Sequence, residues 1–250
     1  MLTVLGLIAG VAEAGTGVAA ASACTGMMSR DLPAAECDAW QALYDATGGA
    51  QWLQCSEYRA NPCLCQRVQC HDNRNIRKLL LHKNNLVGTI PAAIGRFPKL
   101  EVLGLMENEL AGPVPPELGA LSWLEMLFIG DNALEGALPP SIGDLTSLVS
   151  LYVGNNKLGG ALPASLARLT DLNGLYLANN TFRGPLPAGL DWEQFEECGS
   201  HRCCTLGGEG NRFSCPLPQG ALKYCNVNAT DCVAAAADDG GSDEGPRDEL

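Results

Sequence analysis

A 24-residue period runs through the middle of this 250-residue chain and limits the possible fold more than any other feature. Apolar residues keep fixed offsets before an asparagine in every copy, beginning with Leu79 and Leu81, and a glycine and a proline keep fixed offsets after it. The asparagines are Asn84, Asn108, Asn132, Asn156 and Asn180. Five copies in register over 76–195 predict a repeat protein built by stacking one short unit.

The recurring residue types indicate how one copy folds. Alternation at Leu79 and Leu81 is typical of a short strand whose leucines point inward. The asparagine amide can pair backbone groups that would otherwise be buried without partners, while glycine and proline permit and fix a tight return. One copy cannot bury its own leucines, so the copies are predicted to stack into a solenoid with a parallel sheet on its concave face.

The spacing L-x-x-L-x-L-x-x-N-x-L is that of a leucine-rich repeat, and its extension N-x-L-x-G-x-[I/V/L]-P-x-x-[L/I]-G resembles the plant-type class. Polygalacturonase-inhibiting proteins, receptor-kinase ectodomains and secreted algal or protist proteins carry such repeats. Small departures are Ala167, where the fourth copy lacks its last glycine, and Asp191-Trp192 at the end of the fifth. The resemblance implies an α/β solenoid, a right-handed superhelix capped at both ends.

Twelve cysteines flank the repeats, six on each side. An open solenoid exposes leucines at its ends, so 24–75 and 196–233 are predicted to be caps stapled by disulfides, with the pairing left open. Segments 36–73 and 211–232 also resemble the caps of plant-type proteins. The cysteines are Cys24, Cys37, Cys55, Cys63, Cys65, Cys70, Cys198, Cys203, Cys204, Cys215, Cys225 and Cys232.

Zinc is the alternative use of these cysteines. The two clusters with suitable ligands are Cys63, Cys65, Cys70 and His71, and Cys198, His201, Cys203 and Cys204. A cysteine content near 5% fits an oxidising compartment, where disulfides are favoured over thiolate ligands. No metal or other cofactor is therefore expected.

Both ends of the chain resemble targeting signals. Residues 1–23 hold an apolar run followed by Ala-x-Ala sites, which predicts a cleaved signal peptide, with an uncleaved anchor as the alternative. Residues 234–250 form an acidic, small-residue tail predicted to be disordered. The tail ends in a tetrapeptide that resembles an endoplasmic-reticulum retrieval signal, made of Arg247, Asp248, Glu249 and Leu250.

Outward positions of the predicted strands form a candidate ligand-binding surface. The residues between the inward leucines include Phe128, Tyr152 and Tyr176, and such aligned aromatics dominate many interfaces. The next outward column is mostly small, which predicts that the rings are uncovered. Acidic edges and a basic patch at Arg77, Lys78 and Lys83 are predicted around them. The remaining candidate ligand-binding residues are Met106, Glu101, Glu107, Glu125 and Asp131.

Further features bear on partners and modification. Two sequons predict N-glycosylation at Asn179 and Asn228. A net charge of −12 argues against nucleic acid and anionic membranes as partners. Three histidines, none near a catalytic motif, predict no enzymatic activity and no catalytic residues.

Two functions from different classes follow. The first is a non-enzymatic binding module that recognises a protein, peptide or glycan on its concave face. The alternative is a resident folding or quality-control factor of the endoplasmic reticulum, held there by a retrieval receptor. The predicted location is the lumen of that compartment, with secretion as the alternative and no stable membrane insertion after signal cleavage.

Overall fold

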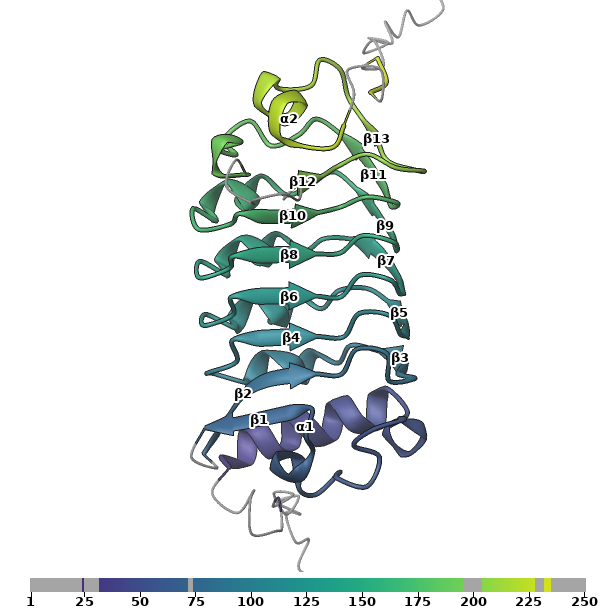
Figure 1. Ribbon diagram of the computed structural model, residues 1–250, viewed down its shortest axis with the longest axis vertical. Coiled ribbons are helices and arrows are strands. Elements are labelled where there is room, and N and C mark those ends of the chain that lie inside the picture. Colours follow the sequence, from purple (N-terminus) through teal and green to yellow (C-terminus); the bar gives the residue numbers. More distant parts are fainter. Residues whose placement is uncertain (1–23, 25–31, 72–73, 196–203, 228–231, 235–250) are drawn as a thin grey trace, which may run out of the picture.

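The chain folds as an elongated stack of coils capped at both ends (Figure 1). The computed structural model describes Cys24 and residues 32–71, 74–195, 204–227 and 232–234. Each coil contributes one strand to a first sheet, which is parallel except where β1 pairs antiparallel with β2. Its strands in order are β1 (Val68–His71), β2 (Asn75–Leu80), β4 (Val102–Gly104), β6 (Met126–Phe128), β8 (Ser150–Tyr152), β10 (Gly174–Tyr176) and β12 (Cys204–Thr205).

A second sheet, which the repeat pattern did not predict, runs along the edge that follows each asparagine (Figure 1). Its strands use the residues expected only to turn the chain, and the glycine of each copy holds a positive φ, as at Gly136 (80°). The strands are β3 (Val87–Thr89), β5 (Glu109–Gly112), β7 (Ala133–Ala137), β9 (Lys157–Gly160), β11 (Thr181–Gly184) and β13 (Arg212–Phe213).

Short 3-10 helices close the first four coils on the side opposite the first sheet. They follow the recurring prolines, whose extended backbone precedes the first helical residue, as at Pro139 (φ −67°, ψ 142°). The helices of the repeats are η3 (Ala92–Arg96), η4 (Pro116–Ala120), η5 (Pro140–Asp144) and η6 (Ala164–Arg168). The shorter ones in the flanking segments are η1 (Gly49–Gln51), η2 (Pro62–Leu64) and η7 (Glu193–Phe195).

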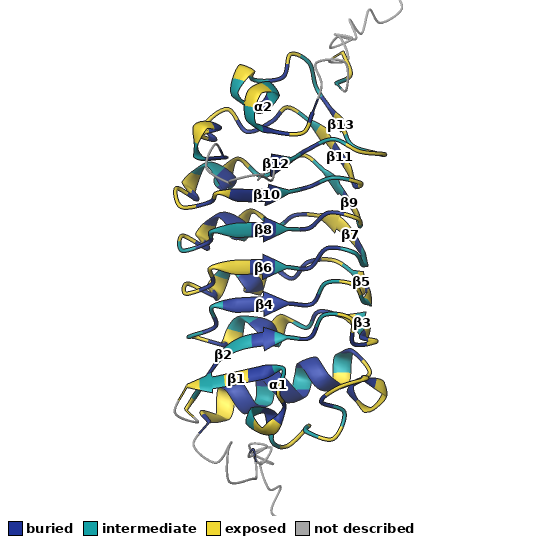
Figure 2. Ribbon diagram, viewed as in Figure 1, coloured by how far each residue is buried: buried dark blue, intermediate teal, exposed yellow. Residues whose placement is uncertain are grey.

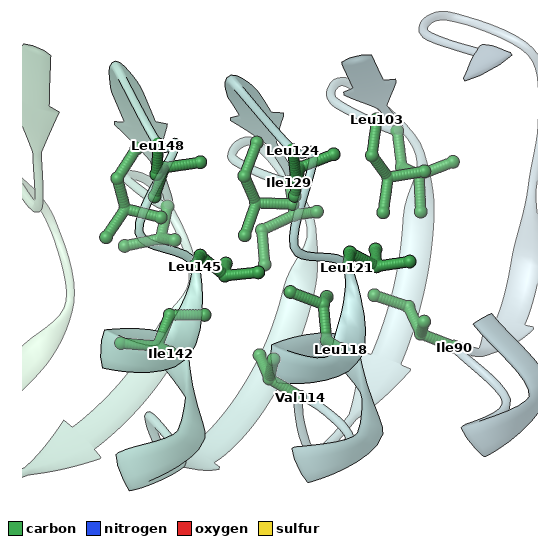
Figure 3. Packing of buried hydrophobic residues seen from close by; sticks show 14 of the residues in the cluster. Ile90, Leu103, Val114, Leu118, Leu121, Leu124, Ile129, Ile142, Leu145 and Leu148 are labelled. Carbon is green, nitrogen blue, oxygen red and sulfur yellow. The ribbon is translucent and has the colours of Figure 1, made fainter. Parts of the chain in front are cut away.

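Leucine and isoleucine side chains fill the space between the sheets and the 3-10 helices. Leu124 and Ile129 from the strand side meet Leu118 of η4 and the following Leu121, and the next coil repeats the arrangement (Figure 3). All four side chains are fully buried, and each such burial contributes about 1.5–3 kcal/mol. Because the core runs the length of the stack, its two ends need covers.

The recurring asparagines join successive coils. Asn132 donates from Nδ2 to the carbonyl oxygens of Leu105 (3.0 Å), Ile129 (3.2 Å) and Gly130 (2.9 Å). Its Oδ1 accepts the backbone N–H of Leu110 at 2.9 Å. Both polar ends of the amide are thus used at the turn, as the repeat pattern predicted.

The N-terminal cap is built on α1 (Ala34–Ala46), which packs against η3 and covers the first coil (Figure 1). Trp40 and Trp52 are buried edge to face, with ring centroids 5.6 Å apart. Buried Glu36 accepts hydrogen bonds from Asn75 Nδ2 and from the N–H of Ile76 (2.7 Å), which ties the helix to β2. Burial raises the pKa of Glu36, against the effect of these two donors.

The C-terminal flank contains a sixth coil before its helix α2 (Gln219–Tyr224). Strand β12 pairs parallel with β10, and β13 with β11. Asn211 repeats the role of the recurring asparagines: its Nδ2 donates to Leu177 O at 2.9 Å, and its Oδ1 accepts the N–H of Phe182 at 3.0 Å. The sequence placed 196–233 wholly in the cap because Asn211 follows Asn180 by 31 residues rather than 24.

Disulfides staple both flanks. The pairs are Cys24–Cys37, Cys55–Cys65, Cys63–Cys70, Cys204–Cys225 and Cys215–Cys232. The predicted solenoid with disulfide-bonded ends is therefore confirmed. Cys198 and Cys203 lie outside the described residues.

Candidate functional site

The first sheet places the predicted aromatic residues side by side. Phe128 pairs in register with Tyr152, and Tyr152 with Tyr176. We call these three residues the aromatic column. The strand positions that carry them are partly exposed between buried neighbours (Figure 2). Leu80 and Gly104 hold the equivalent positions in the coils before them.

Tyr152 is held in one orientation by its surroundings. Its hydroxyl donates to Asp131 Oδ2 at 2.8 Å, and its ring centroid lies 5.6 Å from that of Tyr176. The ring covers Gly130, since a Cβ built on that glycine would lie 2.0 Å from Cε1 of Tyr152. The small neighbouring column was predicted to leave the rings uncovered; at Gly130 it instead provides the space that one ring occupies.

These contacts alter the acidity of Tyr152. Burial, followed by the hydrogen bond to Asp131, raises the pKa of its hydroxyl to about 12. At neutral pH the side chain is therefore a neutral donor fixed on a carboxylate. A ring held in this way loses little conformational entropy when a partner packs on it.

A polar rim borders the aromatic column where the strands of the first sheet end. It consists of Lys83, Glu107, Asp131, Asn155 and Asn179, each with a positive φ between 52° and 55°. This backbone conformation suits asparagine and aspartate better than lysine or glutamate. The last three side chains are linked by hydrogen bonds: Asn155 Nδ2 donates to Asp131 (2.7 Å), and Asn179 Nδ2 donates to Asn155 (2.6 Å).

Charges at the N-terminal end of the surface are paired rather than separated. Lys83 Nζ lies 3.0 Å from Glu107 Oε2, and Arg77 forms an ion pair with Glu101. The predicted division into a basic patch and acidic edges is therefore wrong at two of its three bases, because Arg77 and Lys83 are each paired with an acid of the next coil. Among the four predicted acids, Glu125 is exposed, and Asp131 accepts the bonds of Tyr152 and Asn155.

Two exposed apolar residues beside the column were missed by the sequence analysis. Met126 begins β6 and is 37% exposed, and Trp123, in the turn leading into that strand, is 46% exposed. Lys99 Nζ lies 3.7 Å from the centroid of the Trp123 ring. Met126 lies two residues before Phe128 and therefore also points outward. Counting back the strand alternation from inward-facing Leu127 would have identified it. Trp123 lies in a turn, where the repeat pattern carries no signal.

Met106, two residues after the end of β4, is half-buried. It occupies the same position in its coil as Gly130 does in the next. Asn179 is exposed, and its Oδ1 accepts the N–H of Glu209 at 3.0 Å. The signal segment, His201, Asn228 and the four residues of the predicted retrieval signal lie outside the described residues.

The described residues include no group of three or more His, Cys, Asp or Glu side chains placed to hold a metal ion. Three cysteines of the first zinc candidate, Cys63, Cys65 and Cys70, are in disulfides, as is Cys204 of the second. Within the same part of the chain, no helix combines the length and hydropathy that a membrane crossing requires.

Comparisons with known proteins agree with this architecture. The family model "Leucine Rich Repeat" matches residues 147–169, the copy that contains β8. No curated protein sequence matches the chain. Among solved structures, the ectodomain of the receptor kinase SOBIR1 from Arabidopsis thaliana is 27% identical with a TM-score of 0.52, over 62% of this chain and 85% of that one.

Two further structures from Arabidopsis thaliana are complexes. A chain of the BIR3–SERK2 complex is 26% identical with a TM-score of 0.57, over 72% of this chain and 95% of that one. The ectodomain of GASSHO1/SCHENGEN3, solved with CASPARIAN STRIP INTEGRITY FACTOR 2, is 32% identical with a TM-score of 0.58 over 68% of this chain. The match spans 20% of that ectodomain. Repeat pattern, family match and structural similarity together show that this chain folds as a leucine-rich-repeat solenoid and is similar to the ectodomains of plant receptor kinases.

Proposed function

We propose that this protein is a non-enzymatic binding module that recognises a protein or peptide partner through the aromatic column on its first sheet. The observation that carries the proposal is the alignment of Phe128, Tyr152 and Tyr176 on three paired strands, each ring part-exposed. Tyrosine is enriched among residues that dominate binding energy at interfaces, and aromatic side chains in general supply large contact areas.

The dimensions of the column favour an extended segment as its ligand. Neighbouring strands lie about 4.8 Å apart, so the three rings span about 10 Å. An extended chain rises about 3.3 Å per residue, and the column therefore matches about three residues of a peptide or exposed loop. Met126 and Trp123 enlarge the apolar area on one side, and the polar rim offers hydrogen bonds on the other.

Part of the proposed binding surface is also ordered in the free protein. Tyr152 is fixed by Asp131 and by its packing over Gly130, so one ring of the column is ordered in the free protein. Two of the similar structures are complexes with a protein or a named factor, which supports this class of partner for leucine-rich repeats of this type. The five disulfides in the described part of the chain support a place in the secretory pathway or outside the cell.

Selection from a random peptide library tests the proposal. Peptides enriched on residues 24–250 are expected to lose at least about tenfold in affinity with Phe128→Ala or Tyr176→Ala, the scale of an interface hot spot. Val87→Ser is the matched control, because Val87 is 49% exposed on β3 of the second sheet. Equal binding by all three variants would contradict the proposal. A glycan array run in parallel would identify a carbohydrate ligand, which would overturn the peptide assignment while retaining the surface.

A further inference from the structure

The second sheet ends in two arginines that face one another. In this sheet the residue three places after the asparagine in one coil pairs with the residue one place after it in the next. Glu135 and Lys157 meet in this way as opposite charges, whereas Arg183 of β11 is paired with Arg212 of β13. Like charges directly opposite in a sheet are destabilising unless a counter-charge lies between them.

No counter-charge is present in the described part of the chain. Both arginines are exposed, and neither forms an ion pair with an acid in residues 32–71, 74–195, 204–227 or 232–234. Arg168, which is also exposed on a repeat, is by contrast paired with Asp144 at 2.7 Å. The two guanidiniums, which have no acidic partner among the described residues, offer parallel donors of the kind that bind carboxylates.

The last described residues, 232–234, lie beside this arginine pair. Val233 donates its N–H to the carbonyl oxygen of Phe213 (2.9 Å), and its own carbonyl oxygen accepts the N–H of Cys215 (2.8 Å). Arg212 immediately precedes Phe213, so the main chain passes within one residue of the arginine pair (β13 in Figure 1).

The segment that follows has the complementary charge. Residues 238–250 hold six acids and one arginine, and the first two are Asp238 and Asp239. Asp238 is the fourth residue after Ala234, which gives it a reach of up to about 14 Å. Arg183 lies one strand spacing, about 4.8 Å, beyond Arg212. Both guanidiniums are thus within range of the first acids.

We infer that the acidic segment 238–250 docks on Arg183 and Arg212 at the end of the second sheet. The tether is short, which raises the effective concentration of the segment at the site, so individually weak ion pairs suffice for occupancy. A protein that binds residues 247–250 would then compete with Arg183 and Arg212 for this segment. The exposure of that tetrapeptide would depend on ionic strength, since charge contacts at a surface are screened by salt.

Zero-length carbodiimide cross-linking tests the contact. In the double variant Arg183→Lys and Arg212→Lys, the introduced amines should couple to carboxyls of the tail, with the joined peptides identified by mass spectrometry in the monomer. The ion pair Lys83–Glu107, at 3.0 Å, is an internal control for the reaction. Coupling at Lys83 without coupling at 183 or 212 would overturn the inference, and so would coupling found only between two copies of the chain.

Proteolysis of the full chain gives a second measurement. A glutamate-specific protease should cleave at Glu244 several-fold faster in the variant Arg183→Gln and Arg212→Gln than in the wild type. Arg168→Gln, which removes one paired surface charge, is the control and should leave the rate unchanged. Equal cleavage of all three proteins would show that the tail is not held by the arginines.

Discussion

At the scale of single residues, the surface is organised by pairs that cross from one coil to the next. Tyr152 donates to Asp131, Asn155 donates to the same carboxylate, and Lys83 meets Glu107. Each pair joins positions about 24 residues apart in sequence, so a periodic sequence brings complementary groups into one line. The periodicity allowed the aromatic column to be identified, but it could not show which polar groups pair.

Gly130 should be the most sensitive glycine on the first sheet. A methyl group at this position would lie 2.0 Å from the Tyr152 ring, so Gly130→Ala must displace the ring or strain the strand. Overpacking of this kind costs about 1–3 kcal/mol in the free energy of unfolding, measurable by urea denaturation. Gly104→Ala is the control, since its nearest contact would be an ordinary 3.5 Å. Equal effects at the two positions would contradict the packing described for Tyr152.

The hydroxyl of Tyr152 should lose its proton at a higher pH than an ordinary tyrosine. Its pKa of about 12 lies above the ordinary value of 10. Because the folded state holds the proton more tightly than the unfolded state, the associated stability is fully present below pH about 10 and is lost as pH rises through about 12. Ultraviolet titration of the wild type against Tyr152→Phe isolates this group. Asp131→Asn should lower the pKa of Tyr152, and an unchanged titration would refute the hydrogen bond.

At the scale of elements, each coil is stabilised by one amide at its turn. The sequence identified this element in the five regular copies because leucines, asparagine, glycine and proline all keep their offsets. It missed the sixth coil at β12 and β13, where the longer spacing before Asn211 breaks the period. It also missed the second sheet, because alternation over so few residues, interrupted by glycine, carries little strand signal.

Asn211 should therefore act as a repeat asparagine despite its position in the cap. Asn211→Ala removes bonds to Leu177, Leu206 and Phe182 and leaves buried backbone groups unpaired. The expected cost is at least about 2 kcal/mol, similar to that of Asn132→Ala. Urea denaturation of both variants provides the measurement. Asn155→Ala on the exposed rim should cost less than either, and a harmless Asn211→Ala would argue against a sixth coil.

At the scale of the whole molecule, the protein is a stack of similar coils that differ in their surface residues and in the segments that cover the two ends. The sequence predicted the solenoid and its two disulfide-bonded flanks because packing leucines between stacked coils leaves few alternatives. It could not fix the distribution of charge, since ion pairs such as Arg77–Glu101 depend on register between coils. It also left the cysteine pairing open, which the fold resolves by bringing Cys204 beside Cys225.

The targeting prediction belongs to this scale. If residues 247–250 are a retrieval signal, deleting them from an internally tagged chain should shift the protein from the endoplasmic reticulum to the culture medium. Immunoblots of cells and medium measure the change. Replacing the same four residues with alanine is the length-matched control and should have the same effect. Retention of both variants in the cell would remove the retrieval hypothesis and leave the binding proposal intact.

The most direct test of the binding proposal is a crystal structure of the protein with a peptide selected on it. The peptide should lie across β6, β8 and β10, with its side chains against Phe128, Tyr152 and Tyr176 and its polar groups toward the rim. A peptide bound instead to the second sheet or to either cap, with the aromatic column still open to solvent, would contradict the proposal.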